Sequence, residues 1–124
     1  GYMSTDAQML NSKDRTKDHF ISPQTYAYYL LDNWNIYIDF DKFMKEWTFC
    51  SQTIAVTSEE NDRLKGFTLN NDDTGNVIKV TASIVDRYEL AGIDLYHDKV
   101  DVVDKFPFEV SEEFLEYERK YLLV

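Results

Sequence analysis

Residues 63–80 constrain the fold more than any other stretch, because they place a turn signal between two strand-like segments. Residues 70–75 contain only Asn, Asp, Thr and Gly. Asn and Asp side chains hydrogen-bond to nearby backbone groups and Gly75 accepts a positive φ, so the chain can reverse its direction here. The segments on either side, 64–69 and 77–84, are rich in residues that favour strands. The sequence therefore predicts a β-hairpin.

Length and cysteine content limit the class of protein. The chain has 124 residues, enough for one domain with its own apolar core. Its single cysteine, Cys50, excludes an internal disulfide and predicts a reducing, intracellular compartment. No stretch approaches the roughly 18 apolar residues that a membrane-spanning helix needs, so we expect no membrane contact.

The charge balance argues against broad contact with nucleic acid. The chain has 13 Lys and Arg against 23 Asp and Glu, a formal net charge of −10. Such a surface repels a phosphate backbone. Three specific alternatives remain, namely a local basic groove, a basic protein partner, and mimicry of nucleic acid by rows of carboxylates. An acidic surface that serves only solubility is the simplest interpretation.

The first half of the chain indicates a tail followed by a helix. Residues 1–20 contain few large apolar side chains, which predicts a flexible N-terminal tail before a single domain at 21–124. Ser22 and Pro23 then form a helix-start signal, which predicts a helix over residues 23–34. Its helically spaced apolar residues predict a face for packing. They are Tyr26, Tyr29, Leu30 and Trp34.

The remaining segments decide the fold class. Residues 35–47 carry both strand and helix patterns, whereas 48–57 read as a strand. Residues 111–124 form either a helix capped by Ser111, with acidic residues first and basic residues last, or a strand with alternating apolar side chains. Two strands after the hairpin would complete a five-stranded barrel. We therefore predict a mainly β barrel with an N-terminal helix. The alternative is an α+β fold with a C-terminal helix.

A family resemblance rests on two segments, Ile54-Ala-Val-Thr-Ser58 and Phe67-Thr-Leu-Asn-Asn-Asp-Asp-Thr-Gly75-Asn-Val-Ile-Lys-Val80. Separated by a charged loop, they resemble the first three strands of OB-fold subunits of single-strand-binding complexes. The likeness is to the middle subunit of replication protein A and to the Stn-type subunit of the telomeric CST complex. It implies an OB-fold domain over 21–124, a nuclear location at the telomere, and docking to a small OB-fold partner subunit within a larger complex. Weak contact with single-stranded DNA would accompany that docking.

The candidate site residues lie on the hairpin. Single-strand binders combine aromatic stacking platforms with cations that follow the phosphates. Lys65, Phe67 and Lys79 are the residues of these types that we predict to bind nucleic acid. The alternative for Phe67 is a place in the barrel core, because barrel interiors need large apolar side chains.

No catalytic or metal-binding pattern is present in the sequence. His19 and His97 lie far apart, and neither has a Cys, Ser or carboxylate partner at the spacing of a triad or a zinc site. We therefore expect a protein that is not an enzyme and has no metal or cofactor.

Two functions follow from these observations. The first is a non-enzymatic subunit of a telomere-end or replication protein A-like complex. The second is an acidic inhibitor or immunity-type protein that blocks a basic nucleic-acid-binding protein. The C-terminal segment distinguishes them, because a strand there supports the first function. A terminal helix with exposed carboxylates supports the second, and the relevant residues are Glu112, Glu113, Glu116 and Glu118.

Overall fold

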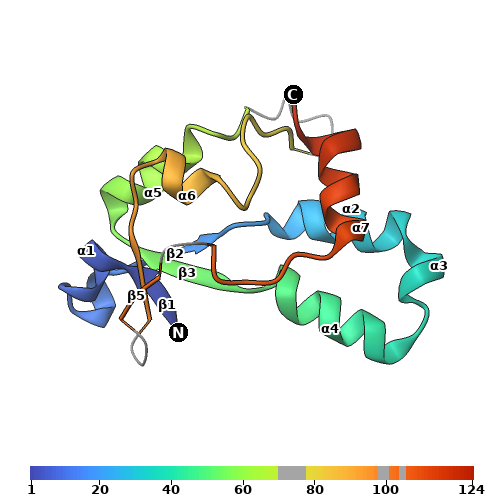
Figure 1. Ribbon diagram of the computed structural model, residues 1–124, viewed down its shortest axis with the longest axis horizontal. Coiled ribbons are helices and arrows are strands. Elements are labelled where there is room, and N and C mark those ends of the chain that lie inside the picture. Colours follow the sequence, from blue (N-terminus) through green and yellow to red (C-terminus); the bar gives the residue numbers. More distant parts are fainter. Residues whose placement is uncertain (70–77, 98–100, 104–105) are drawn as a thin grey trace.

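The computed structural model describes residues 1–69, 78–97, 101–103 and 106–124. These residues form an α+β fold in which helices surround an open mixed sheet (Figure 1). Helices α2, α3, α4 and α7 gather at one end of the molecule and α1 lies at the other, while α5 and α6 lie side by side between them.

The sheet has the strand order β2-β3-β1-β4-β5. Strand β1 is parallel to β3, and the other neighbouring pairs are antiparallel. In the centre, Met3 is paired with Ala55 on one side and with Tyr96 on the other. The strands are β1 Tyr2–Ser4, β2 Thr16–His19, β3 Thr53–Val56, β4 Leu95–His97 and β5 Asp101–Val103.

The N-terminal residues are part of this sheet. A flexible tail was predicted for residues 1–20, but they form the central strand β1, helix α1, a 3₁₀ turn and the edge strand β2. Ser4 and Ala7 have no exposed surface. The three-residue strand β1 gave no strand signal because its position depends on pairing with β3 and β4, which come much later in the chain.

The predicted OB-fold barrel is wrong. Within the described residues the sheet is open, with β2 and β5 at its two edges, and helices account for much of the chain. Two segments that could have supplied strands are helical. The first forms α4, Phe40–Cys50, and the second forms α7, Glu112–Tyr117, followed by the π-helical turn η2, Glu118–Leu122. The structure thus has the α+β class and the C-terminal helix of the alternative.

Side-chain caps explain why these segments are helices. The Asp39 carboxylate accepts a hydrogen bond from the Lys42 backbone N–H at 3.0 Å, and Ser111 Oγ accepts one from the Phe114 N–H at 3.1 Å. Each cap satisfies one of the N–H groups that a helix start leaves without a partner. The expected strand count was therefore a weaker guide than these local signals.

The remaining helices include the one predicted from Ser22 and Pro23. Helix α2 begins at Pro23, and Ser22 Oγ accepts from the Thr25 N–H, which confirms the predicted start. It ends at Asp32. The other elements are α1 Thr5–Gln8, the 3₁₀ turn η1 Ser12–Asp14, α3 Trp34–Tyr37, α5 Ser58–Lys65 and α6 Arg87–Leu90.

Within the described residues, the two arms of the predicted hairpin meet in an antiparallel bridge between Thr68 and Val80. Two hydrogen bonds flank it, from the Leu69 N–H to the Lys79 carbonyl at 2.9 Å and from the Thr81 N–H to the Phe67 carbonyl at 2.8 Å. The predicted turn lies outside the described residues.

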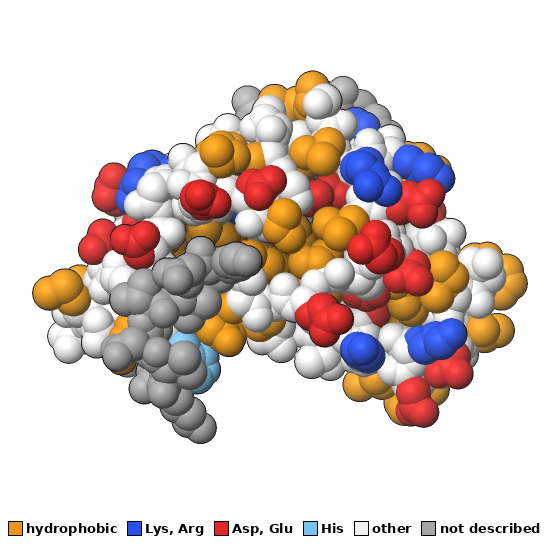
Figure 2. Space-filling model, in the orientation of Figure 1, with side chains coloured by type: hydrophobic (Ala, Val, Ile, Leu, Met, Phe, Trp, Pro, Cys, Tyr) orange, Lys and Arg blue, Asp and Glu red, His pale blue; other side chains and the backbone are white. Residues whose placement is uncertain are grey.

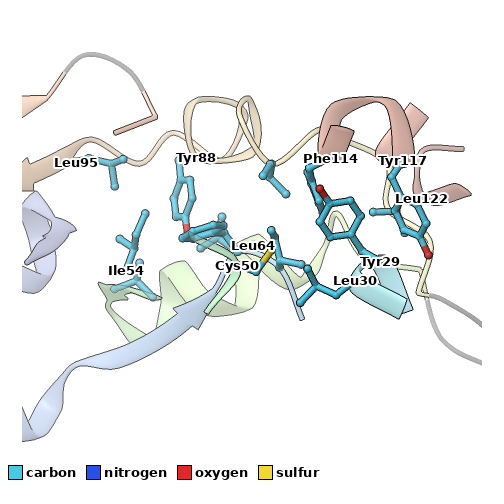
Figure 3. Close-up of a cluster of buried hydrophobic side chains, with 14 of the residues drawn as sticks. Tyr29, Leu30, Cys50, Ile54, Leu64, Tyr88, Leu95, Phe114, Tyr117 and Leu122 are labelled. Carbon is cyan, nitrogen blue, oxygen red and sulfur yellow. The ribbon is translucent and has the colours of Figure 1, made fainter. Parts of the chain in front are cut away.

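The core joins one face of the sheet to the helices (Figure 3). Ile54 and Val56, which alternate along β3, have no exposed surface, in line with the predicted strand pattern. Towards the helical end the core is aromatic, and the rings of Tyr29 and Phe114 meet edge to face with centroids 5.1 Å apart. Such edge-to-face pairs add to the free energy gained from burial.

A buried carboxylate ties the central strand to α5. Glu60 Oε1 accepts from Ser4 Oγ at 2.5 Å and from the Thr57 backbone N–H at 2.9 Å, while Thr57 Oγ1 accepts from the Glu60 N–H. The second and third bonds form a capping box. One side chain therefore starts the helix and anchors the N-terminal strand.

We expect Glu60→Ala to lower the free energy of unfolding by about 2–4 kcal/mol, because it removes a cap and leaves the buried Ser4 O–H and the half-buried Thr57 N–H without their acceptor. Asp62→Ala, an exposed position on the same helix, is the matched control. Urea unfolding measures both variants. Equal midpoints for the two would contradict this role for Glu60.

Candidate functional site

The structure brings together two of the three residues predicted to bind nucleic acid. Lys65 and Phe67 both line a pocket of about 360 Å³. Lys79 instead donates from Nζ to the Tyr121 carbonyl at 2.6 Å. Because the described sheet is open, no barrel face presents these side chains to a strand of DNA, and their contact with nucleic acid stays a prediction.

A groove with an excess of carboxylates lies where the α2–α3 junction meets α7 and η2. Asp32, Glu113 and Glu116 are exposed there, against one lysine, Lys120. Figure 2 shows acidic, basic and hydrophobic side chains close together over this helical end of the molecule. We call it the acidic groove, lined by Asp32, Asn33, Ile36, Glu113, Glu116, Tyr117, Lys120 and Tyr121.

The charges of the acidic groove do not cancel. Lys120 Nζ lies 2.9 Å from Glu116 Oε1, and this hydrogen-bonded pair lowers the pKa of Glu116 and raises that of Lys120. The Tyr117 hydroxyl donates to Asp32 Oδ2 at 2.9 Å, and burial raises the pKa of Tyr117, so it stays neutral. After the Lys120 pair, the charges of Asp32 and Glu113 remain, and the groove attracts cations.

Helix α7 presents carboxylates on one side and apolar residues on the other. Glu112, Glu113 and Glu116 are exposed, whereas Phe114 is buried. Exposure of Glu118 on the same helix was a condition for the second function, but this side chain is only 1 % exposed. Its carboxylate accepts from Ser83 Oγ at 2.6 Å and from the Ile84 N–H at 3.1 Å. Burial raises the pKa of Glu118, with the two hydrogen bonds opposing that shift.

Several large apolar side chains are exposed on or next to α2, α3 and α4, at the same end of the molecule as the acidic groove. We call this set the apolar helical face. On α4, Phe40, Met44 and Trp47 recur at intervals of four and three residues, which places them on one side of the helix. The exposed fractions reach 72 % at Phe40. A group of large exposed apolar side chains typically marks an interaction site. The set is Leu31, Trp34, Ile38, Phe40, Met44 and Trp47.

The exposure of Trp34, one residue of the apolar helical face, follows from a break in the predicted helix. The aromatic stripe of 23–34 was predicted to be a packing face, and Tyr29 and Leu30 are indeed buried. At Asn33 the backbone leaves the helical conformation, with φ −113° and ψ 30°, and its amide donates to the Tyr29 carbonyl at 2.9 Å. Trp34 therefore begins a new helix and is 64 % exposed. Asn33 was the available signal, since Asn side chains compete for helix backbone groups.

One buried carboxylate holds these helices in place. Glu46 Oε2, on α4, accepts from the Tyr37 hydroxyl at 2.5 Å and from the Tyr29 hydroxyl at 3.0 Å. The Tyr29 hydroxyl also lies 3.4 Å from Oγ of Ser111, the cap of α7. The resulting network joins α2, α3, α4 and α7. We call it the Glu46 network.

The described residues hold no cluster of His, Cys, Asp and Glu suited to a metal ion. Cys50 is buried, and burial raises the pKa of its thiol, which makes it a poor nucleophile.

Comparisons of the chain with protein-family models, with curated proteins and with solved structures found no match. A functional conclusion must therefore come from the geometry of the chain itself. Within the described ranges, no helix is long and apolar enough to cross a membrane.

The buried tyrosines predict a loss of stability at alkaline pH. Burial raises the pKa of Tyr29, Tyr37 and Tyr88 above the ordinary value of about 10. The unfolded chain then loses phenolic protons before the folded chain does. The free energy of unfolding should be unaffected below about pH 9 and should fall as the pH rises above about 10.

Absorbance at 295 nm and circular dichroism, followed together, measure this effect. We expect some of the nine tyrosines to ionise while the fold is intact and the buried ones only as it unfolds. Ionisation of all nine in a single step with retained native structure would contradict the assignment.

Proposed function

We propose that this chain is a non-enzymatic binding protein that docks its helical end on a basic surface of a partner protein, of the kind that binds nucleic acid. The observation that carries the proposal is the acidic groove at the same end of the molecule as the apolar helical face. The Glu46 network underlies both, because it fixes the helices that present them.

The acidic groove suits arginine or lysine side chains of a partner. Asp32 and Glu113 offer carboxylates that the ion pair of Lys120 with Glu116 does not neutralise. A guanidinium group binds a carboxylate through two parallel hydrogen bonds, which gives both attraction and orientation. The net charge of −10 adds a longer-range attraction that speeds the encounter with a basic surface.

The apolar helical face offers apolar surface that a bound partner can bury, which adds binding free energy to the attraction between charges. Trp34, Ile38 and Phe40 are 64 %, 75 % and 72 % exposed, so most of their surface remains to be covered. Tryptophan is enriched among the residues that dominate binding energy at protein interfaces. An apolar centre with charged residues near it is also the usual arrangement of such interfaces.

A surface that binds nucleic acid fits this combination because it carries the opposite charge. Such surfaces are rich in Lys and Arg that neutralise phosphates. Of the two functions predicted from the sequence, the inhibitor-type function is therefore the one that we propose. The single-strand-complex function depended on a barrel that the described sheet does not form.

Intrinsic fluorescence tests the proposal directly. Trp34 and Trp47 are the two tryptophans of the chain, and both belong to the apolar helical face. We expect a synthetic helical peptide with an arginine-rich and a leucine-rich side to change their emission, with weaker affinity as salt increases. Labelled single-stranded DNA, titrated in the same buffers, should not bind.

Charge-reversal variants show whether peptide binding depends on the acidic groove itself or on the net charge of the whole chain. Glu113→Lys with Glu116→Lys should weaken peptide binding about tenfold or more, whereas Asp62→Lys with Glu89→Lys, which changes the net charge equally at exposed sites on α5 and α6, should not. Trp34→Ala should also weaken peptide binding. Leu90→Ala, which removes an apolar side chain of similar exposure outside the apolar helical face, is the control and should not.

Two results would contradict the proposal. One is an equal loss of affinity in the groove pair and the control pair, since binding would then follow net charge alone. The other is tight binding of single-stranded DNA, which would favour the first of the sequence-derived functions.

A further inference from the structure

A second site lies outside the docking surfaces. The 360 Å³ pocket is enclosed by the segment from β2 into α2, the end of α5, the stretch 78–84, and the inner side of α7 and η2. Its walls are mainly apolar. The residues that define them are Phe20, Ile21, Phe67, Ile78, Phe114 and Leu122.

The two carboxylates in the pocket wall already have partners. Asp18 binds Arg87 through Oδ1 at 3.0 Å and accepts the Tyr88 hydroxyl through Oδ2. Glu118 accepts from the Ser83 hydroxyl and the Ile84 N–H. Both side chains are buried, so their hydrogen-bonding capacity is used inside the fold.

Arg87 also lines the pocket and is held by Asp18, but two lysines of the lining are not used in this way. Lys17 and Lys65 line it and are exposed, and within the described ranges no carboxylate forms an ion pair with either. The first turn of α2, a helix of ten residues, also borders the pocket through Ser22, Pro23 and Thr25. A helix N-terminus carries partial positive charge and favours anions. An apolar interior thus meets an electropositive rim.

We propose that this pocket binds a small amphipathic carboxylic acid, with its alkyl chain between the apolar walls and its carboxylate near Lys17, Lys65 and the start of α2. The volume is within the range of small-molecule sites. Decanoate is small enough for a site of this volume.

The chemistry explains why a carboxylate is preferred to other amphiphiles. A neutral alcohol would gain the apolar contacts but not the attraction of two lysines. A cationic amphiphile would face like charges at the rim. A carboxylate gains charge-assisted hydrogen bonds, which are stronger than neutral ones.

Calorimetric titration with sodium decanoate and with decyltrimethylammonium, which shares its alkyl chain but carries the opposite charge, tests the site. We expect saturable binding of decanoate and at least about tenfold weaker binding of the cation. Backbone amide NMR signals of Phe67 and Val80 should shift with decanoate, whereas those of Trp34 and Phe40 should not.

Two kinds of variant test the contribution of the lysine charges and that of the apolar cavity separately. Lys17→Met with Lys65→Met keeps most of the apolar stems and should weaken decanoate about tenfold, whereas Lys13→Met with Lys42→Met, which removes the same charge elsewhere, should not. Ala82→Leu, which adds volume inside the pocket, should weaken both ligands.

Three results would overturn the proposal. They are no saturable binding of decanoate, equal binding of the two amphiphiles, and equal affinities in the two lysine pairs. The lysine pairs change only exposed side chains, so the test does not depend on whether the Ala82 variant folds.

Discussion

The helical end of the molecule depends on one buried carboxylate. Glu46 accepts two phenolic hydroxyls from helices that precede α4, and one of those phenols touches the cap of α7. The buried polar groups satisfy one another, and this favours a single arrangement of the four helices. The alternative to this arrangement is an unpaired buried charge, which is costly. The Glu46 network therefore fixes the positions of the helices that carry the exposed side chains of the proposed docking surface.

Helix α7 takes part in both proposed sites through opposite sides. Glu113 and Glu116 face the acidic groove, whereas Phe114 and Glu118 line the apolar pocket. This follows from helical geometry, because residues three or four apart share a side and neighbouring residues do not. A ligand in the pocket would contact the same helix that a docked partner contacts. The residues involved differ, so each site can be altered without changing the charge of the other.

Local capping signals were the most reliable part of the sequence. Ser22 with Pro23 and Ser111 each predict a helix start that the structure contains, because a cap is decided by a few neighbouring atoms. The fold class was missed where an expected strand count outweighed such signals. Strand β1 could not be predicted from Tyr2–Ser4, since its pairing with β3 and β4 is entirely non-local.

The sites were harder to predict than the helices. A helical stripe does not reveal whether it will be covered, and Trp34 is exposed only because the chain breaks at Asn33. Lys65 and Phe67 were selected for a barrel face, yet tertiary packing places them at a pocket built from four separate segments. The acidic groove was foreseen only as carboxylates on a terminal helix. Only the folded structure shows that these carboxylates lie in one groove with Asp32.

Amide hydrogen exchange in a Glu46→Leu variant tests the central role of Glu46 most directly. Leucine replaces the Glu46 carboxylate with an apolar side chain of similar size and leaves the hydroxyls of Tyr29 and Tyr37 without this acceptor. The account predicts faster exchange at Lys42 in α4 and at Phe114 in α7, with unchanged exchange at Ile54 in the sheet. Unchanged protection in α4 and α7, or an equal loss of protection throughout the chain, would contradict it.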